Sequence, residues 1–303
     1  MAVSRQRVVS FFRAGCLASF PTLVYALISP VPVQESRYPA VSTFFSVDLA
    51  AQAGGPAYKA PRTPSGQPDF EGIWQVWNTA KYSVEPHVAS LGVQAGLGVI
   101  VDPPDGLIPY TPWARNHQKE NFAKSRTPDP VKNADPVAKC YQPGVPRFMY
   151  MGWPIQIIQT GTEVHFISEY AHTWRIATLS SAPRDKDAEN FLGVARGRWE
   201  GETLVVDTTN LNDVGWLDMS GNFLTKTSHV VERLTRTGPD NIDYEVIIED
   251  PRIFTGPWKM RMTIERQSQK RLLEYECIDL LAEAGFPPIW ERDWDQPLAV
   301  PAR

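Results

Sequence analysis

The sequence predicts a mainly β fold: an antiparallel barrel or sandwich of about ten strands, with one short helix and long Pro-rich loops. First, apolar and polar residues alternate along most of residues 155–278, and turn residues interrupt the alternation at short intervals. Second, the 10 Trp, 10 Tyr and 13 Phe suit pleated surfaces, whereas the 27 Pro disfavour long helices. Third, strand and helix patterns do not alternate, so a parallel sheet is not expected.

The order of elements follows from local signals. Before residue 155 we expect a strand at 70–77, irregular chain at 78–110, a helix at 112–125, a break at 127–137 and an extended loop at 143–154. Thr111 can cap the helix, and Pro112 suits its first position. The later expected strands are 155–159, 164–170, 174–179, 191–199, 203–208, 229–236, 242–249, 258–266 and 272–278. Short turns pair them as hairpins, the last being 258–266 with 272–278.

The N-terminus has the features of an export signal. Three arginines, Arg5, Arg7 and Arg13, precede an apolar run over residues 14–28. Residues 51–53 then have the small-x-small form of a cleavage site, although cleavage nearer Ser29, or retention as an uncleaved anchor, also fits the run. We therefore expect an exported protein, periplasmic or secreted, with no membrane contact beyond this segment.

Composition divides the chain into four parts. These are a targeting segment at 1–53, a Pro/Gly linker at 54–68, a single β-barrel domain at 69–284 and a C-terminal tail at 285–303. The net charge of −4 offers no concentrated basic face, so nucleic acid is not an expected partner. The sequence does not indicate an oligomeric state.

Removal of the export segment leaves two cysteines, Cys140 and Cys277. In an exported domain such a pair is expected to form a disulfide, with two buried free thiols as the alternative. The distant cysteines and the spacing of the histidines give no metal signature. Rossmann, phosphate-loop, Gly-x-Ser-x-Gly and His-Glu-x-x-His motifs are missing as well, so we expect neither a metal nor a cofactor.

Two stretches resemble known groups of proteins. Residues 69–74, Asp-Phe-Glu-Gly-Ile-Trp, resemble the Gly-x-Trp signature that opens lipocalin-type barrels, and the following hairpins meander as in that superfamily. This resemblance implies a lipocalin-like (calycin-type) barrel. Residues 197–208 and the Tyr150-Met151 pair resemble an uncharacterised family of secreted bacterial proteins. The second resemblance spans nearly the whole mature chain and implies export, but it brings no established chemistry.

Polar side chains interrupt the apolar faces of several expected strands. Glu232 shares a strand face with Val230 and Leu234. Burying this carboxylate between aliphatic residues would be costly unless it is paired or protonated. Asp207 interrupts its own strand in the same way. Titratable groups inside an apolar barrel typically mark a ligand site, so these positions predict one.

The expected turn at 169–175 gathers the most chemistry. It offers the Tyr170 phenol, the His172 imidazole and the Arg175 guanidinium within a few residues. His172 could act as a general base, and Tyr170 or Arg175 could stabilise a developing oxyanion. A solvated turn with Trp174 stacked on Arg175 is the alternative.

These observations define the candidate site. The candidate catalytic residues are Tyr170, His172, Arg175, Asp207, His229 and Glu232. The candidate substrate-binding residues are Trp174, Trp199, Asn212, Asp213, Trp216 and Tyr244. A structural role for His229 on its strand, and turn capping by Asn212 and Asp213, are the alternatives.

The candidate site predicts a secreted enzyme that processes a small molecule by cofactor-free acid/base chemistry in a barrel pocket, of the lyase, isomerase, hydratase or cyclase type. The alternative is a periplasmic lipocalin-like binding protein for an apolar or aromatic small molecule. A third hypothesis is an envelope interaction protein without a pocket. An enzyme requires an acid and a base that converge on one point of a cavity, whereas a binding protein requires an apolar cavity with scattered donors.

Overall fold

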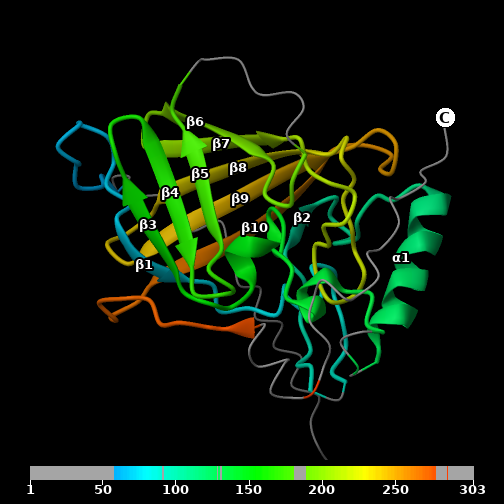
Figure 1. Ribbon diagram of the computed structural model, residues 1–303. Coiled ribbons are helices and arrows are strands. Elements are labelled where there is room, and N and C mark those ends of the chain that lie inside the picture. Colours follow the sequence, from blue (N-terminus) through cyan, green and yellow to red (C-terminus); the bar gives the residue numbers. More distant parts are fainter. Residues whose placement is uncertain are drawn as a thin grey trace, which may run out of the picture. The chain divides into compact units, whose positions relative to one another are not determined.

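Ten strands form a single sheet in the computed structural model, and nine of them close into a barrel (Figure 1). The order around the barrel is β1-β3-β4-β5-β6-β7-β8-β9-β10; β1 pairs with β10 to close it, and β2 adds to β10 from outside. The strands are β1 Gly72–Gln75, β2 Ile100–Asp102, β3 Ile155–Gln159, β4 Glu163–Ser168, β5 Trp174–Thr178, β6 Val194–Glu200, β7 Thr203–Thr209, β8 His229–Arg236, β9 Asn241–Glu249 and β10 Trp258–Arg266. The predicted mainly β barrel is confirmed.

The structure describes residues 58–90, 92–127, 129, 132–180, 189–277 and 285. All of them belong to one compact unit that spans residues 55–303. The predicted export segment, and the predicted tail beyond residue 285, lie outside the described residues.

The packing of β1 against β10 explains the Gly-x-Trp motif of Gly72 and Trp74. Trp74 pairs with Arg266 of β10. The Arg266 guanidinium lies 4.1 Å from the centre of the Trp74 ring, and its Nη1 donates to Glu71 O at 3.0 Å. Gly72 has a φ of +134°, and a Cβ atom at this position would overlap Arg266 Nη1. Glycine is therefore required both by the backbone conformation and by the side chain that crosses it.

Alternate side chains of the strands fill the barrel interior. On β8, β9 and β10 every second residue is buried, as the alternation in the sequence predicts. Inward residues with 0% exposure include Leu204, Val206, Val230, Leu234, Ile242, Val246, Ile248 and Met260. They belong to one continuous hydrophobic cluster, which also contains Trp74, Phe166 and Trp258.

The last expected hairpin is wrong. Of the expected strand 272–278, the described part makes only an isolated bridge, between Tyr275 and Tyr170, while Ile278 lies outside the described residues. The reason is that β10 has no free edge. β9 pairs with one of its sides, and β1 and β2 occupy the other.

Smaller differences concern strand direction and the loops. β5 and β6 run parallel, although they pair only at Ala177–Ala195 and Thr178–Arg196. The chain expected to be irregular at 78–110 contains β2. Two 3-10 helices also form where breaks and extended chain are expected: η1 Pro136–Lys139 and η2 Arg147–Tyr150. A proline that interrupts an α-helix is still compatible with the first position of a short 3-10 helix, as Pro136 shows.

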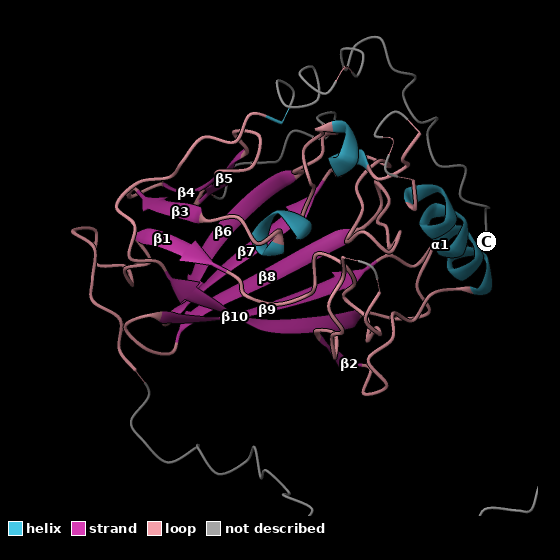
Figure 2. Cartoon of the chain, turned by 90° about the horizontal axis from the view of Figure 1, so that it is seen from below, coloured by secondary structure: helices cyan, strands magenta, loops and turns pink. Residues whose placement is uncertain are grey.

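The helix predicted at 112–125 is confirmed as α1 (Pro112–Ser125), which lies outside the barrel (Figures 1 and 2). The predicted cap is present, since the Thr111 side chain accepts a hydrogen bond from Ala114 N. The buried side of the helix is partly polar, and Gln118 Nε2 donates to Ser220 O at 2.5 Å. Helices on a protein surface usually pack through an apolar stripe. Here hydrogen bonds attach the helix to the rest of the domain instead.

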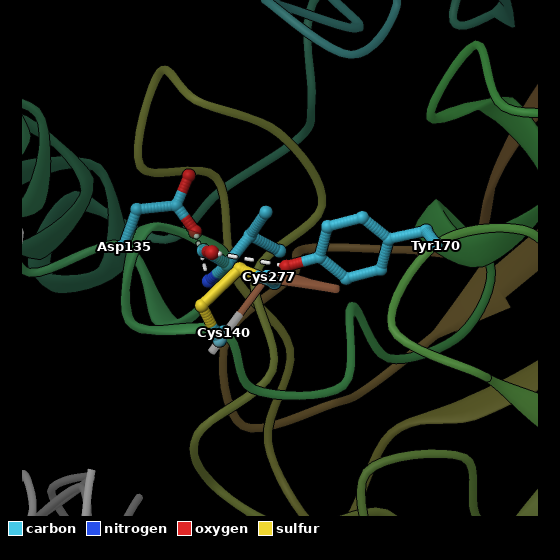
Figure 3. Close-up of a disulfide and its surroundings, with 5 residues drawn as sticks. Asp135, Cys140, Tyr170 and Cys277 are labelled. Carbon is cyan, nitrogen blue, oxygen red and sulfur yellow. Dashed lines mark hydrogen bonds between the residues drawn. A yellow bond between two sulfur atoms is a disulfide. The ribbon is translucent and has the colours of Figure 1, made fainter. Parts of the chain in front are cut away.

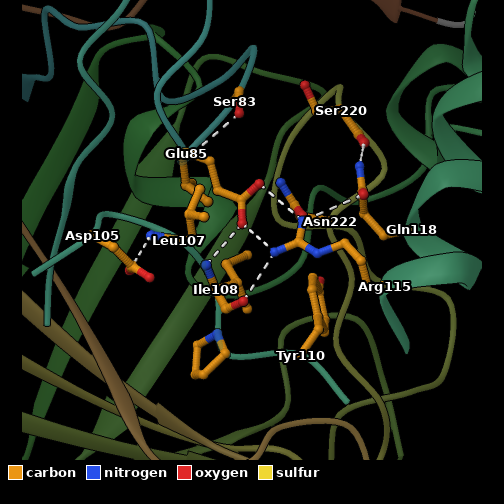
Figure 4. A network of polar contacts seen from close by, with 12 residues as sticks. Ser83, Glu85, Asp105, Leu107, Ile108, Tyr110, Arg115, Gln118, Ser220 and Asn222 are labelled. Carbon is orange, nitrogen blue, oxygen red and sulfur yellow. Dashed lines mark hydrogen bonds and ion pairs between the residues drawn. The ribbon is translucent and has the colours of Figure 1, made fainter. Parts of the chain in front are cut away.

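A polar network joins α1 to the preceding loop (Figure 4). Arg115 Nη1 and Nη2 lie 3.0 and 2.7 Å from Glu85 Oε2 and Oε1. Ile108 N donates to Glu85 Oε1 at 2.8 Å, and Ile108 O accepts from Arg115 Nη2 at 3.0 Å. The Arg115 guanidinium also lies 4.9 Å from the centre of the Tyr110 ring. The network fixes the loop against the first turn of the helix.

The Gly72→Ala variant tests the barrel closure. It is expected to lower the free energy of unfolding by about 1–3 kcal/mol, because an L residue is strained at this φ and its methyl group must displace Arg266. Urea denaturation measures the change. Gly161→Ala is the matched control, since Gly161 is exposed and a Cβ atom there would meet nothing within 4 Å. Equal losses in the two variants would contradict the role assigned to Arg266.

Candidate functional site

A cavity of about 270 Å³ lies beside the barrel, where the end of α1, the two 3-10 helices and residues 272–277 (called here the C-terminal segment) meet. Its lining residues all come from outside the barrel strands. The lining is dominated by four aromatic rings and two methionines: Tyr82, Trp153, Tyr170, Tyr275, Met151 and Met219. Its charged members are Lys81, Asp135 and Arg147.

Tyr275 is at the centre of the aromatic wall. Its ring centre lies 4.4 Å from that of Trp153 and 5.6 Å from that of Tyr170. Tyr170 OH donates to Val137 O at 3.0 Å, and Figure 3 shows the ring pointing toward η1. Burial raises the pKa of Tyr170 above its ordinary value. The phenol therefore stays protonated and acts as a fixed donor.

Asp135 and Arg147 form a buried ion pair at the cavity wall. Arg147 Nη1 and Nη2 donate to Asp135 Oδ1 and Oδ2, both at 2.7 Å. Burial disfavours the charge on Arg147, but the carboxylate outweighs it, so the pKa of Arg147 lies above its ordinary value. Asp135 Oδ1 also accepts from Val137 N at 3.0 Å and thereby caps η1. The two charges position the wall and neutralise each other.

The predicted disulfide between Cys140 and Cys277 is confirmed, with Cα atoms 5.6 Å apart (Figure 3). Cys140 directly follows η1, which contributes Val137 and Ala138 to the cavity. Cys277 lies two residues after Tyr275. The covalent bond therefore fixes the C-terminal segment, which carries Tyr275, beside η1, and both contribute to the lining.

The predicted cluster at 169–175 is split by the fold. Tyr170 lines the cavity. His172 lies in an exposed tight turn with a φ of +50°, and its Nε2 contacts Glu276 Oε1. Arg175 is buried in the barrel. Side chains alternate along β5, so Trp174 points to the outside of the barrel and the adjacent Arg175 points into its interior.

Arg175 and Glu232 form a second buried ion pair, inside the barrel. Arg175 Nη1 donates to Glu232 Oε1 at 3.0 Å, and Nη2 contacts Oε2. Arg175 Nη2 also donates to Thr208 Oγ1 at 2.7 Å, and Tyr244 OH donates to Glu232 Oε1 at 2.6 Å. These four residues are at most 3% exposed. The expected cost of burying Glu232 is therefore offset by hydrogen bonds to both of its carboxylate oxygens.

His229 lies on the outer face of the barrel between two carboxylates. Its Nε2 is 3.0 Å from Asp207 Oδ2, and its Nδ1 is 2.7 Å from Glu249 Oε1. The hydrogen bond with Asp207, followed by that with Glu249, raises the pKa of His229 to about 9 against the effect of burial. The ring is then protonated at neutral pH and donates from both nitrogens. This geometry favours a clamp across β7, β8 and β9 over a general base.

The candidate acids and bases do not converge on one point. They occupy the cavity (Tyr170), an exposed turn (His172), the barrel interior (Arg175 and Glu232) and the outer wall (Asp207 and His229). The fold brings together two pairs of the candidate catalytic residues, Arg175 with Glu232 and Asp207 with His229, but at separate places.

The candidate substrate-binding residues are dispersed as well. Trp174 is 57% exposed on the outside of β5, and its Nε1 donates to His165 Nδ1 at 3.2 Å. Trp199 packs on Phe70 with ring centres 5.7 Å apart, and Trp216 is buried. Tyr244 belongs to the ion pair inside the barrel. The cavity lining contains none of these side chains.

Asn212 caps its own turn, which is the alternative to ligand binding, whereas Asp213 links its loop to the turn at Lys226. Asn212 Oδ1 accepts from Val214 N at 3.2 Å, and Asp213 Oδ1 accepts from Lys226 N at 2.8 Å. Within the described ranges no group of three or more His, Cys, Asp or Glu side chains could hold a metal ion.

Sequence reasoning missed most of the cavity. Asp135, Arg147 and Trp153 lie in segments that the prolines mark as irregular or extended, where no periodic pattern shows which way a side chain points. One usable signal is the predicted disulfide. It brings the neighbourhood of Cys277, including Tyr275, to a defined place in the fold.

Comparison of the chain with protein-family models gives no match, and comparison with curated protein sequences gives none either. The closed barrel is compatible with a lipocalin-like fold, while membership of the secreted bacterial family stays a prediction. No helix in the described part of the chain is both long and apolar enough to cross a membrane.

Arg175→Leu is expected to lower the free energy of unfolding by about 3–5 kcal/mol, because it leaves the Glu232 carboxylate unpaired inside the barrel. The double variant Arg175→Leu/Glu232→Leu should lose less than the sum of the two single variants, since it leaves neither charge behind. Urea denaturation of all four proteins measures the coupling. Arg233→Leu, which removes an exposed partner of Glu200, is the control with a far smaller effect. Strictly additive losses would contradict a buried pair.

His229→Gln is expected to destabilise the protein most at acid pH. The folded-state pKa of about 9 exceeds the ordinary value of 6.5, so the clamp's contribution is fully present below pH 6.5 and disappears as the pH rises through 9. The measurement is the difference in free energy of unfolding between wild type and variant at about pH 6 and about pH 9.5. A difference that is constant or grows with pH would show that the carboxylates do not hold the charged ring.

Proposed function

We propose that this protein binds a small aromatic or apolar molecule in the cavity beside its barrel. The observation that carries the proposal is the set of four aromatic rings and two methionines around a space of about 270 Å³. Such side chains pack well against flat apolar ligands. The volume lies just below the range of about 300–1,000 Å³ typical of pockets for drug-sized ligands, so the cavity suits one or two fused rings.

The polar groups of the cavity favour binding over acid/base catalysis. Asp135 is engaged by Arg147 and by a backbone N–H, and the Tyr170 hydroxyl donates to Val137 O. A lyase or isomerase would need a free acid and a free base that face a common point. Because Asp135 and Tyr170 already have structural partners, they shape the wall, and neither is the free acid or base that such an enzyme would need.

We further propose that the protein acts outside the cytoplasm. The disulfide fits an oxidising compartment, and the arginines followed by an apolar run at the N-terminus support export. A binding protein in such a compartment would carry or sequester its ligand without changing it chemically.

Isothermal titration with the neutral probe 1-naphthamide tests the proposed binding. Wild type is expected to bind it with a dissociation constant between about 10 μM and 1 mM, as befits a fragment-sized ligand. Ala138→Trp fills the cavity from η1 and should abolish binding, with Met219→Trp as a second blocking variant if the first does not fold.

Ala123→Trp is the matched control, because Ala123 lies on the exposed side of α1 and is not part of the lining. It should leave binding of 1-naphthamide unchanged. The proposal fails if wild type does not bind the probe. It fails equally if folded blocking variants bind as tightly as wild type, because the probe would then occupy another place.

A further inference from the structure

Among the described residues that line the cavity, there is one cation more than there are carboxylates. These charged residues are Lys81, Arg147 and Asp135, which carry two positive charges and one negative charge. The bidentate contact commits Arg147 to Asp135. Among the described residues no carboxylate lies within ion-pair distance of Lys81 Nζ, whose contact with a neighbouring side chain is the Tyr82 ring at 5.1 Å. The excess charge of the cavity therefore resides on Lys81.

The Lys81 ammonium group lies close to the aromatic part of the lining. The backbone oxygen of Lys81 accepts from Met219 N at 3.0 Å, so the residue is anchored to another part of the wall. Its Nζ lies close to Gly152, where an added Cβ atom would be 3.5 Å away. Gly152 connects Met151 and Trp153, which both line the cavity. The ammonium group is therefore held beside the aromatic surface.

A half-buried ammonium group that has no counter-ion in the described part of the chain gains from an anion. Lys81 is only partly exposed, and the ring of Tyr82 replaces part of its hydration shell. The contact with the ring is weaker than a charge-assisted hydrogen bond to a carboxylate. An anionic ligand group placed here would also neutralise the net charge of the lining, and a single negative charge suffices.

We infer that the cavity selects aromatic carboxylates, with the carboxylate on Lys81 Nζ and the ring system against Trp153 and Tyr275. The inference rests on the proposed binding function and narrows its ligand to one chemical class. It assigns separate tasks to the two cations of the lining. Arg147 holds the wall together with Asp135, and Lys81 recognises the ligand.

A pair of isosteric probes, 1-naphthoate and 1-naphthamide, tests the inference because the two differ in charge but hardly in shape. At low ionic strength, isothermal titration of wild type should show about tenfold tighter binding of 1-naphthoate. Lys81→Met keeps an unbranched apolar side chain and should remove this preference while 1-naphthamide still binds. Lys59→Met is the matched control, since Lys59 is exposed and outside the lining, and it should keep the preference.

The outcomes separate the two proposals. If wild type binds neither probe, the binding function itself fails. If wild type binds both probes equally well, the function stands and the selection of carboxylates is overturned. A preference that survives in Lys81→Met would also overturn the inference, because another group would then hold the carboxylate. Lys81→Gln provides the same measurement if the methionine variant does not fold.

Discussion

Closure of the barrel between β1 and β10 is the constraint on which the rest of the structure depends. Arg266 reaches across Gly72 to lie on Trp74, and only a glycine leaves room for it. With β1 and β2 on one side of β10 and β9 on the other, the sheet offers no edge to residues 272–277. This segment therefore leaves the sheet and can supply a wall for the cavity.

The filled interior places a second demand on the chain. A polar side chain that points inward costs free energy unless it finds partners there. The two Nη atoms of Arg175 and both carboxylate oxygens of Glu232 find them in each other, in Thr208 and in Tyr244. Replacement of such buried pairs by apolar residues is often neutral or stabilising, so their presence does not by itself show that they stabilise the fold. Because Arg175 and Glu232 bind each other and do not line the cavity, we assign them a structural role. The candidate ligand site lies outside the barrel.

The cavity is an assembly of short segments whose polar groups do different work. Asp135 binds Arg147 and caps η1, so these two charged side chains hold the cavity wall in place. Tyr275 joins Trp153 and Tyr170 because the disulfide fixes the chain that carries it. Once the structural pairs are set apart, one charge remains for a ligand. This distinction, rather than the number of titratable residues, identifies the group that recognises it.

The sequence alone predicts most of the strands with their faces, the helix with its Thr111 cap, and the disulfide between its two remaining cysteines, but it misses β2 and wrongly predicts a strand at 272–278. The confirmed features depend on local alternation, on single capping residues and on composition. All three can be read from short stretches of the sequence without knowing the fold. Which polar residues lie together depends instead on the tertiary structure. Arg175 meets Glu232 from a position 57 residues away, and Tyr275 meets Trp153 because β10 has no free edge. Contacts between loops depend on where whole strands end, and no local pattern contains that information.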